Sequence, residues 1–190
     1  TQQDLRTVQK EIEDVLFSVK NLGELSDRIK DRLLSYGEQM SSKIVSAFLQ
    51  SEGFPAVFQD SRKLIATDSH FGNANVDSRK TNENLKNWKL ENQIYVVTGF
   101  IAKDKNDDTT TLGRGGSDYT AAILGSGLKA DEIQIWTDVD GFLTADPRLV
   151  KNAFSQSELS YQEAMEMSYF GAKVIYPPTM IPAIESQIPI

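Results

Sequence analysis

The stretch from Thr109 to Gly127 constrains the fold more than any other part of the sequence. It reads Thr-Thr-Thr-Leu-Gly-Arg-Gly-Gly-Ser-Asp-Tyr-Thr-Ala-Ala-Ile-Leu-Gly-Ser-Gly and follows a β-branched and aromatic run at Ile94 to Phe100, which is typical of a buried strand. An apolar stripe at helical spacing then predicts a helix, with Ser117 at its N-cap and Asp118 in its first turn. Glu132 to Val139 is predicted to be the next strand. Strand, helix and strand in sequence favour a parallel pair with a right-handed crossover, and therefore an α/β fold.

The glycine cluster between the first strand and the helix suits a bound anion. Gly113, Gly115 and Gly116 let the backbone approach a ligand closely, and the free N–H groups of a helix's first turn favour negative charge. Arg114 adds a planar fork that matches a carboxylate or a phosphate. By itself the loop also fits an ordinary glycine-rich turn with a solvated arginine, because its pattern is neither a P-loop nor a dinucleotide fingerprint.

Composition excludes several classes of protein. A chain of 190 residues with 39% hydrophobic and 25% charged residues is expected to be one soluble globular domain. The lack of a long apolar run argues against a membrane span. The net charge of −7, with no basic block to offset it, argues against nucleic acid as a partner. The sequence has no cysteine and one histidine, His70, for which we expect a structural role. With no signal peptide, these features favour the cytoplasm.

Several further elements are predicted before the glycine cluster. Three helical patterns cover Asp4 to Val19, Leu22 to a stop near Gly37, and a stretch from Glu38 to Gly53, with Glu38 as an acid in a first turn. Their apolar stripes fit either a core or an interface. The remaining predictions are short strands at Ala56 to Phe58 and Leu64 to Thr67, a weak helix at Thr81 to Leu90, and an exposed, charged loop at Ala102 to Thr110.

After the second strand of the central unit, the sequence predicts a loop and two helices. Asp138 to Arg148 is rich in turn residues and follows the carboxyl end of a strand, where open α/β sheets bind ligands. Ser160 and Glu163 have capping-box spacing at the start of a helix. Thr179 to Ser186 is predicted to be the last helix.

Five of these stretches together resemble the catalytic domain of aspartate kinases, within the amino-acid kinase superfamily. They are Ser35 to Glu38, Thr67 to Ala74, Leu112 to Tyr119, Trp136 to Arg148 and Ser160 to Val174. Within these, Ser160 to Lys173 and Thr137 to Gly141 look most like the kinase half of bifunctional aspartokinase–homoserine dehydrogenases. The resemblance implies a three-layer α/β/α sandwich with a mainly parallel central sheet. It also implies that residues 1–190 form one catalytic domain.

The resemblance implies transfer of the γ-phosphoryl group of ATP to the β-carboxylate of L-aspartate, with Mg²⁺. This reaction gives 4-phospho-L-aspartate and is the first step of lysine, threonine and methionine biosynthesis. The acceptor carboxylate is already ionised at neutral pH, so no strong general base is required. Catalysis would rest on positioning and on neutralising charge. We expect the full-length protein to be a homo-oligomer.

The family's substrate residues match positions in the first part of this sequence. Glu38 matches the glutamate that contacts aspartate, through its ammonium group, and Arg114 matches the arginine that binds a substrate carboxylate. Gly115, Gly116 and Ser117 belong to the same substrate loop. Asp118 is an orienting or metal-linked acid by this match, or simply an N-cap or first-turn residue. Arg114 and Asp118 are the residues that we expect to be catalytic.

The family's nucleotide residues match later positions. Thr137 and Asp138 match nucleotide contacts, and Leu143 stands where many members have a nucleotide-contacting tyrosine. Arg148 matches an arginine near the phosphates. The far wall of the nucleotide site corresponds to Lys173 and Val174. We assign no set of protein metal ligands.

The sequence also departs from the family's pattern. The family begins with a strand and a Lys-Phe-Gly-Gly-Thr-Ser loop whose lysine contacts the transferring phosphate, and nothing like this loop occurs here. We therefore expect a catalytic domain truncated at both ends, with little activity by itself. Tyr36 and Tyr176 replace histidines common in related motifs. Two alternatives stay open: another kinase, acting on glutamate, N-acetylglutamate, carbamate or a nucleoside monophosphate, and a catalytically silent module for amino-acid sensing or dimerisation.

Overall fold

The computed structural model describes residues 2–138, 141–145, 148–169 and 177–190, in two compact units, Thr1–Ser117 and Asp118–Ile190. The elements of the first unit are α1 (Gln2–Leu22), α2 (Asp27–Ser51), β1 (Ala56–Gln59), the 3₁₀ helix η1 (Ser61–Lys63), α3 (Ser78–Asn87), β2 (Ile94–Val97), β3 (Ile101–Lys103) and β4 (Thr109–Thr111). Helix α4 (Gly116–Leu128) begins at the boundary, and α5 (Tyr161–Tyr169) and α6 (Pro177–Ser186) belong to the second unit.

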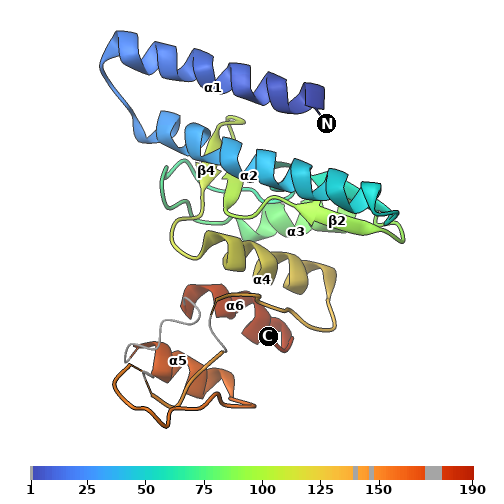
Figure 1. Cartoon of the computed structure of the whole chain (residues 1–190), viewed down its shortest axis with the longest axis vertical. Coiled ribbons are helices and arrows are strands. Elements are labelled where there is room, and N and C mark those ends of the chain that lie inside the picture. The colour runs from blue at the N-terminus through green and yellow to red at the C-terminus, as the bar shows by residue number, and fades with distance from the viewer. Residues whose placement is uncertain (1, 139–140, 146–147, 170–176) are drawn as a thin grey trace. The chain divides into compact units, whose positions relative to one another are not determined.

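Helices α1 and α2 lie along one another in the first unit (Figure 1). The predicted amphipathic helix at the start of the chain is confirmed as α1, which buries Val8. The predicted weak helix is confirmed as α3, where the Asp77 side chain caps the first turn by accepting a hydrogen bond from the Lys80 N–H. No helix in the described ranges has both the length and the apolar character needed to cross a bilayer.

Helix α2 is one continuous helix of 25 residues, so the predicted break near Gly37 is wrong. A glycine inside a helix costs only about 1 kcal/mol relative to alanine, and the helix continues through it. Glu38 therefore lies in mid-helix and is not a first-turn acid. The buried face of α2 is largely polar and consists of Asp31, Ser35, Tyr36, Gln39, Ser42 and Ser46. Of the predicted apolar stripe, Ile44 and Phe48 are 49% and 60% exposed.

Helix α2 packs on strands β1, β2 and β4 (Figure 1). β1 and β2 pair in parallel from Ala56↔Ile94 to Gln59↔Val97, which confirms both predicted strands. β3 and β4 form an antiparallel hairpin. The prediction of an exposed loop at Ala102 to Thr110 is therefore wrong at both ends, because these two residues are fully buried. The charged residues of the hairpin turn concealed the short alternation of the strands.

Two other predicted strands are not observed as strands. Leu64 to Thr67 contributes isolated bridges, Ala66↔Lys103 and Thr67↔Val76. Residues 132–138 are in no strand of the part of the chain that the structure describes, although the Ile133 N–H donates to the Pro189 carbonyl at 2.9 Å. The expected parallel pair across α4 is therefore absent from the described residues, and β2 pairs with β1 instead. Helices and short strands together give an α/β fold.

The second unit has its own small apolar core. Ala122, Ile133, Ala183 and Ile188 are buried together. The capping box predicted at the start of α5 is confirmed. The Ser160 N–H donates to Glu163 Oε2 at 2.8 Å, and the Glu163 N–H donates to Ser160 Oγ at 3.2 Å. The side-chain and backbone hydrogen bonds from Ser160 lower the pKa of Glu163.

Two helical glycines lie in opposite surroundings and make a matched test of packing. A Cβ on Gly37 would meet nothing within 4 Å, whereas a Cβ on Gly125 would lie 2.7 Å from Ile133 Cδ1. We expect Gly37→Ala to raise the free energy of unfolding by about 0.5–1 kcal/mol, through helix propensity. Gly125→Ala should lower it by about 1–2 kcal/mol, because overpacking outweighs that gain. Urea unfolding of both variants checks this pair, and a shift of both midpoints in one direction would contradict it.

Candidate functional site

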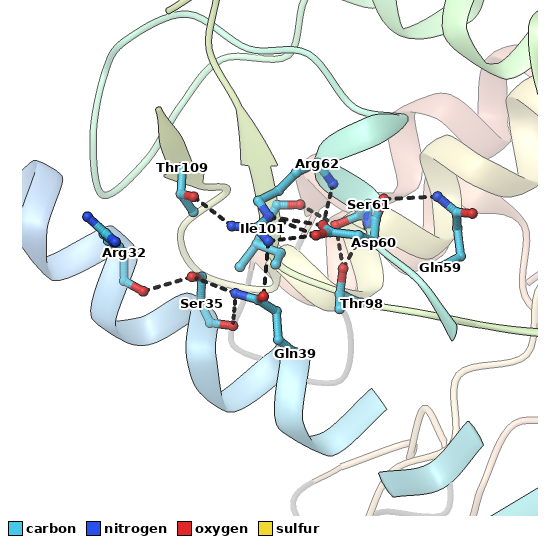
Figure 2. A network of polar contacts seen from close by, with 10 residues as sticks. All are labelled: Arg32, Ser35, Gln39, Gln59, Asp60, Ser61, Arg62, Thr98, Ile101 and Thr109. Carbon is cyan, nitrogen blue, oxygen red and sulfur yellow. Dashed lines mark hydrogen bonds and ion pairs between the residues drawn. The ribbon is translucent and has the colours of Figure 1, made fainter. Parts of the chain in front are cut away.

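The first unit joins helix α2 to strand β4 through buried polar side chains. Arg62 of η1 donates from Nη1 to Thr109 Oγ1 and from Nη2 to Gln39 Oε1, both at 3.0 Å (Figure 2). Its guanidinium also contacts both oxygens of the Asp60 carboxylate at 2.6–3.1 Å. Gln39 in turn donates to the hydroxyl of Ser35 on the same helix at 3.2 Å. The planar fork of an arginine can serve three partners in this way.

A second buried pair anchors η1 to the turn before β3. The Ser61 N–H donates to Thr98 Oγ1 at 2.9 Å, and the two hydroxyl groups lie 2.7 Å apart (Figure 2). The Ser61 hydroxyl also donates to the Ile101 carbonyl at 2.6 Å. Within the described ranges, every buried side-chain nitrogen and oxygen has a hydrogen-bond partner. Since an unsatisfied buried polar group costs about 1–3 kcal/mol, the polar interior favours one arrangement of these elements.

Asp31 on α2 connects the helix to two loops. Its side chain is fully buried, and Oδ2 accepts hydrogen bonds from the N–H groups of Gly72 at 2.8 Å and Thr111 at 2.9 Å. Oδ1 accepts a third hydrogen bond from the Thr111 hydroxyl at 2.9 Å. The Thr111 carbonyl accepts from the Ala74 N–H at 2.8 Å. The loop at residues 68–75 is therefore fixed to the end of β4 from two sides.

The loop at residues 68–75 has an internal carboxylate of its own. Asp68 accepts hydrogen bonds from the Asn75 side chain at 2.7 Å and from the N–H groups of Asn75 and His70 at 3.0 and 3.1 Å. The Asn75 side-chain hydrogen bond is the main cause that lowers the pKa of Asp68. His70 is exposed and contributes its backbone N–H, which fits the structural role expected for it.

The glycine loop after β4 turns sharply and presents Arg114. Gly113 and Gly115 have φ of +71° and +68°, a left-handed conformation that strongly favours glycine. A Cβ on Gly113 would also lie 2.3 Å from Asn73 Oδ1, so the loop at residues 68–75 packs directly on it. Arg114 between these glycines is exposed and has no hydrogen bond or ion pair with any described residue. Its guanidinium is therefore available to an anion.

Helix α4 begins at Gly116, whose N–H donates to the Gly113 carbonyl at 3.1 Å. Ser117 therefore lies within the first turn, and its prediction as the N-cap is wrong. The turn closed by the glycines starts the helix two residues earlier than the Ser-Asp pair suggested. The Ser117 side chain lies against Gly99, where a Cβ would be 2.8 Å from Ser117 Oγ. Asp118 lies in the first turn, as predicted.

Two part-buried carboxyl groups have no hydrogen-bond or ion-pair partner among the described residues: Glu38 in the first unit and Asp118 in the second. Burial raises the pKa of Glu38 and, separately, the pKa of Asp118. Unpaired carboxyl groups with raised pKa values are more common at functional sites than elsewhere. Each is therefore available to a cationic group of a ligand.

The predicted nucleotide residues belong to the second unit. Thr137 and Asp138 are exposed, and the Thr137 hydroxyl donates to Asp138 Oδ1 at 3.1 Å. Leu143 is half-buried and forms an antiparallel bridge with Ser155, and Arg148 is exposed. Lys173, Val174 and Tyr176 lie outside the described residues. The predicted substrate residues from Glu38 to Ser117 belong to the first unit, so a site shared by the two groups stays a prediction.

Four polar residues of the first unit, Asp31, Ser61, Arg62 and Thr98, were not predicted from the sequence. A signal for the face that carries Asp31 was present. Polar residues recur along α2 at Asp31, Ser35, Gln39, Ser42 and Ser46. This spacing of three or four residues marks one helix face. The apolar stripe on the same helix instead favoured another face as the buried one. Ser61, Arg62 and Thr98 have no comparable pattern.

Comparisons with known proteins agree with this arrangement. The model of the amino acid kinase family matches residues 2–190. The chain is 39% identical over 191 residues to lysine-sensitive aspartokinase 3 of Escherichia coli (strain K12), covering 96% of this chain and 42% of that protein. It is 42% identical over 171 residues to a chloroplastic bifunctional aspartokinase/homoserine dehydrogenase 2 of Zea mays, covering 88% of this chain and 19% of that protein.

Among solved structures, the chain resembles E. coli aspartokinase III in complex with aspartate and ADP, with a TM-score of 0.84 and 39% identity. The likeness covers 95% of this chain and 42% of that one. The chain thus spans less than half the length of these relatives. A family model that matches nearly every residue, together with this structural likeness, establishes that the chain belongs to the amino acid kinase family.

Proposed function

We propose that the protein is an aspartate kinase, which transfers the γ-phosphoryl group of ATP to the β-carboxylate of L-aspartate. The observation that carries this proposal is Arg114, an exposed and unpaired guanidinium between two left-handed glycines. An arginine fork binds a carboxylate through two parallel hydrogen bonds. E. coli aspartokinase III, whose structure matches 95% of this chain, was solved with aspartate and ADP.

The roles of the chain's own residues follow from their chemistry. Arg114 binds a carboxylate of the amino acid, and the N–H groups of the first turn of α4 favour the negative charge beside it. Glu38 faces the ammonium group of aspartate, which would supply the partner that this carboxylate lacks. The acceptor carboxylate needs no base, because it is ionised at neutral pH. The protein's task is to position it for an in-line transfer.

The nucleotide belongs to the residues of the second unit in this proposal. Thr137, Asp138, Leu143 and Arg148 contact ATP, together with Lys173 and Val174. In the described part of the chain, no cluster of three or more acidic or histidine side chains could hold a metal ion. Mg²⁺ in such enzymes is commonly bound by substrate phosphates and one or two carboxylates, a role that Asp118 and Asp138 fit. When bound, it would neutralise charge on the phosphates.

The architecture is part of the same proposal. The two small sheets of the first unit would belong to one mainly parallel sheet in a three-layer α/β/α catalytic domain formed by residues 1–190. Such a sheet buries both faces under helices, and α2 already covers β1 and β2 on one side. A cytoplasmic homo-oligomer completes the proposal, since the sequence contains no cysteine for disulfide bonds.

Arg114→Ala in the full-length protein should weaken L-aspartate binding by roughly 10- to 150-fold, because charged hydrogen bonds contribute about 1.5–3 kcal/mol. Arg114→Lys should recover only part of this affinity, since lysine lacks the planar fork. Thermal stability should be unchanged, because Arg114 has no partner among the described residues. Isothermal titration calorimetry with L-aspartate measures the affinity.

The matched control is Arg79→Ala, which removes an exposed arginine from α3. It should bind aspartate like the unchanged protein. Equal losses in both variants would show a general effect of positive charge and contradict the role of Arg114. Binding and phosphorylation of glutamate, N-acetylglutamate or carbamate in place of aspartate would contradict the substrate assignment and favour another member of the family.

Glu38→Gln should separate binding from stability. Burial raises the pKa of Glu38, so ionisation of this carboxyl lowers the stability of the folded state as pH rises through its folded-state pKa. The glutamine variant avoids this loss. We expect its melting temperature to exceed that of the unchanged protein near about pH 8 and the difference to shrink toward about pH 4. Its affinity for aspartate should fall, because the ammonium group loses its partner.

Differential scanning calorimetry across this pH range, with aspartate titrations at neutral pH, makes the measurement. Glu24→Gln, at an exposed position between α1 and α2, is the control and should change neither quantity. Unchanged aspartate affinity in Glu38→Gln would remove Glu38 from the substrate site. A melting difference that grows toward acid pH would refute the effect of burial on this carboxyl.

A further inference from the structure

We propose that Asp31 is a positioning residue that fixes the distance between Arg114 and Glu38, and so sets the affinity for the amino-acid substrate. This inference rests on the proposed function. Asp31 is fully buried and directly bonded to Thr111, at the end of the strand that leads to Arg114, and to Gly72, in the loop that packs on Gly113.

Helix α2 carries both Asp31 and Glu38. Asp31 and Glu38 are seven residues apart on α2, so they lie on the same face, about 10 Å apart along the axis. The helix between them is continuous. Movement of the helix at Asp31 therefore moves Glu38 by a similar amount. An anchor at Asp31 is an anchor for Glu38.

Strand β4 and the glycine loop connect the Asp31 anchor to Arg114. Only two residues, Leu112 and Gly113, separate Thr111 from Arg114. Leu112 is buried, and Gly113 lies against the Asn73 side chain in a left-handed conformation. The chain from Thr111 to Arg114 therefore has little freedom once Thr111 is fixed. Because Asp31 also binds Gly72, one residue before Asn73, it holds the strand and the packing loop together.

The Asp31 side chain suits its buried position because hydrogen-bond donors surround it. A fully buried carboxylate is costly unless donors surround it, and here each oxygen accepts from an N–H or O–H group. An apolar residue would leave two N–H groups and a hydroxyl unsatisfied. An asparagine could keep the geometry, since its oxygen can accept from both N–H groups while its amide donates to the Thr111 hydroxyl. An asparagine variant therefore keeps the shape and hydrogen bonds of the side chain, whereas an alanine variant removes them.

A second connection between α2 and β4 holds the other end of the strand. Arg62 of η1 donates both to Gln39 on α2 and to Thr109, at the start of β4. Asp31 binds Thr111, at the other end of the same strand. Loss of the Asp31 contact therefore frees the end next to the glycine loop, while the start of the strand stays attached to the helix.

The test compares four variants of the full-length protein: Asp31→Ala, Asp31→Asn, Thr111→Val and the double variant Asp31→Asn/Thr111→Val. For each we would measure kcat, the KM for aspartate, the KM for ATP, the melting temperature and amide hydrogen exchange at residues 72–75 and 109–116. Asn84→Ala is the control for stability alone, since it removes a part-buried hydrogen bond from α3 to the Leu64 carbonyl, outside both loops.

We expect Asp31→Asn to raise the KM for aspartate by less than about threefold and Thr111→Val by about three- to tenfold. The double variant should raise it by more than the product of the two, to at least about 30-fold, because the asparagine amide would then face a methyl group. Asp31→Ala should raise it at least about tenfold and accelerate exchange in both loops. The KM for ATP should stay within about twofold in every variant. Asn84→Ala should lower the melting temperature and leave both KM values unchanged.

Several results would overturn the inference. A fall in melting temperature with an unchanged KM for aspartate in Thr111→Val and in the double variant would show a structural role only. Equal increases in the KM values for aspartate and ATP would show a general loss of the fold. If Asp31→Ala does not fold, the other three variants still decide the question. Failure of the unchanged protein to phosphorylate aspartate would instead refute the proposed function, and this inference with it.

Discussion

The hydrogen bonds of the buried Asp31 carboxylate are the interaction on which the arrangement of the first unit depends. Apolar contacts between a helix and a sheet tolerate small shifts, because dispersion and burial are not directional. Hydrogen bonds to a buried carboxylate do not, since a shift leaves costly groups unsatisfied. The small polar residues along this face of α2 also allow close approach to the strands. The contact that brings α2 to β4 is thus directional, and this suits elements that must present ligand-binding groups at a fixed distance.

The paired polar groups of this framework contrast with three charged groups that lack a partner. Arg114 and Glu38 in the first unit, and Asp118 in the second, have no side-chain partner in the described part of the chain, although buried carboxyl groups are usually paired. Burial raises the pKa of both acids, so their ionised forms reduce the stability of the fold. In the described ranges, every buried side-chain nitrogen and oxygen has a hydrogen-bond partner. Leaving these three groups unpaired places the local cost where a charged ligand can remove it. Such a distribution is expected where activity and stability conflict.

Local patterns predicted the parts of this structure that depend on neighbouring residues. Strands β1 and β2, the capping box of α5 and the turn before α4 follow from residue types within a few positions of each other. The continuity of α2 through Gly37 did not follow in this way. The glycine's cost of about 1 kcal/mol is smaller than the stabilisation of a helix whose buried face bonds to residues far along the chain. Likewise, residues 132–138 have the composition of a strand, but a strand also needs a partner, and composition cannot supply one.

The candidate site divides in the same way. Arg114 and its flanking glycines could be found because one short segment contains the whole motif. Asp31 could not, because its partners lie 41 and 80 residues away, and an aspartate between charged neighbours on a helix is more often solvated. The signal available in the sequence is the regular spacing of polar residues on α2. The structure adds that Ile44 and Phe48 on the same helix are exposed. When a long helix has a regular row of small polar residues, that row can be the buried face, and a carboxylate within it then marks the element to which the helix is bonded.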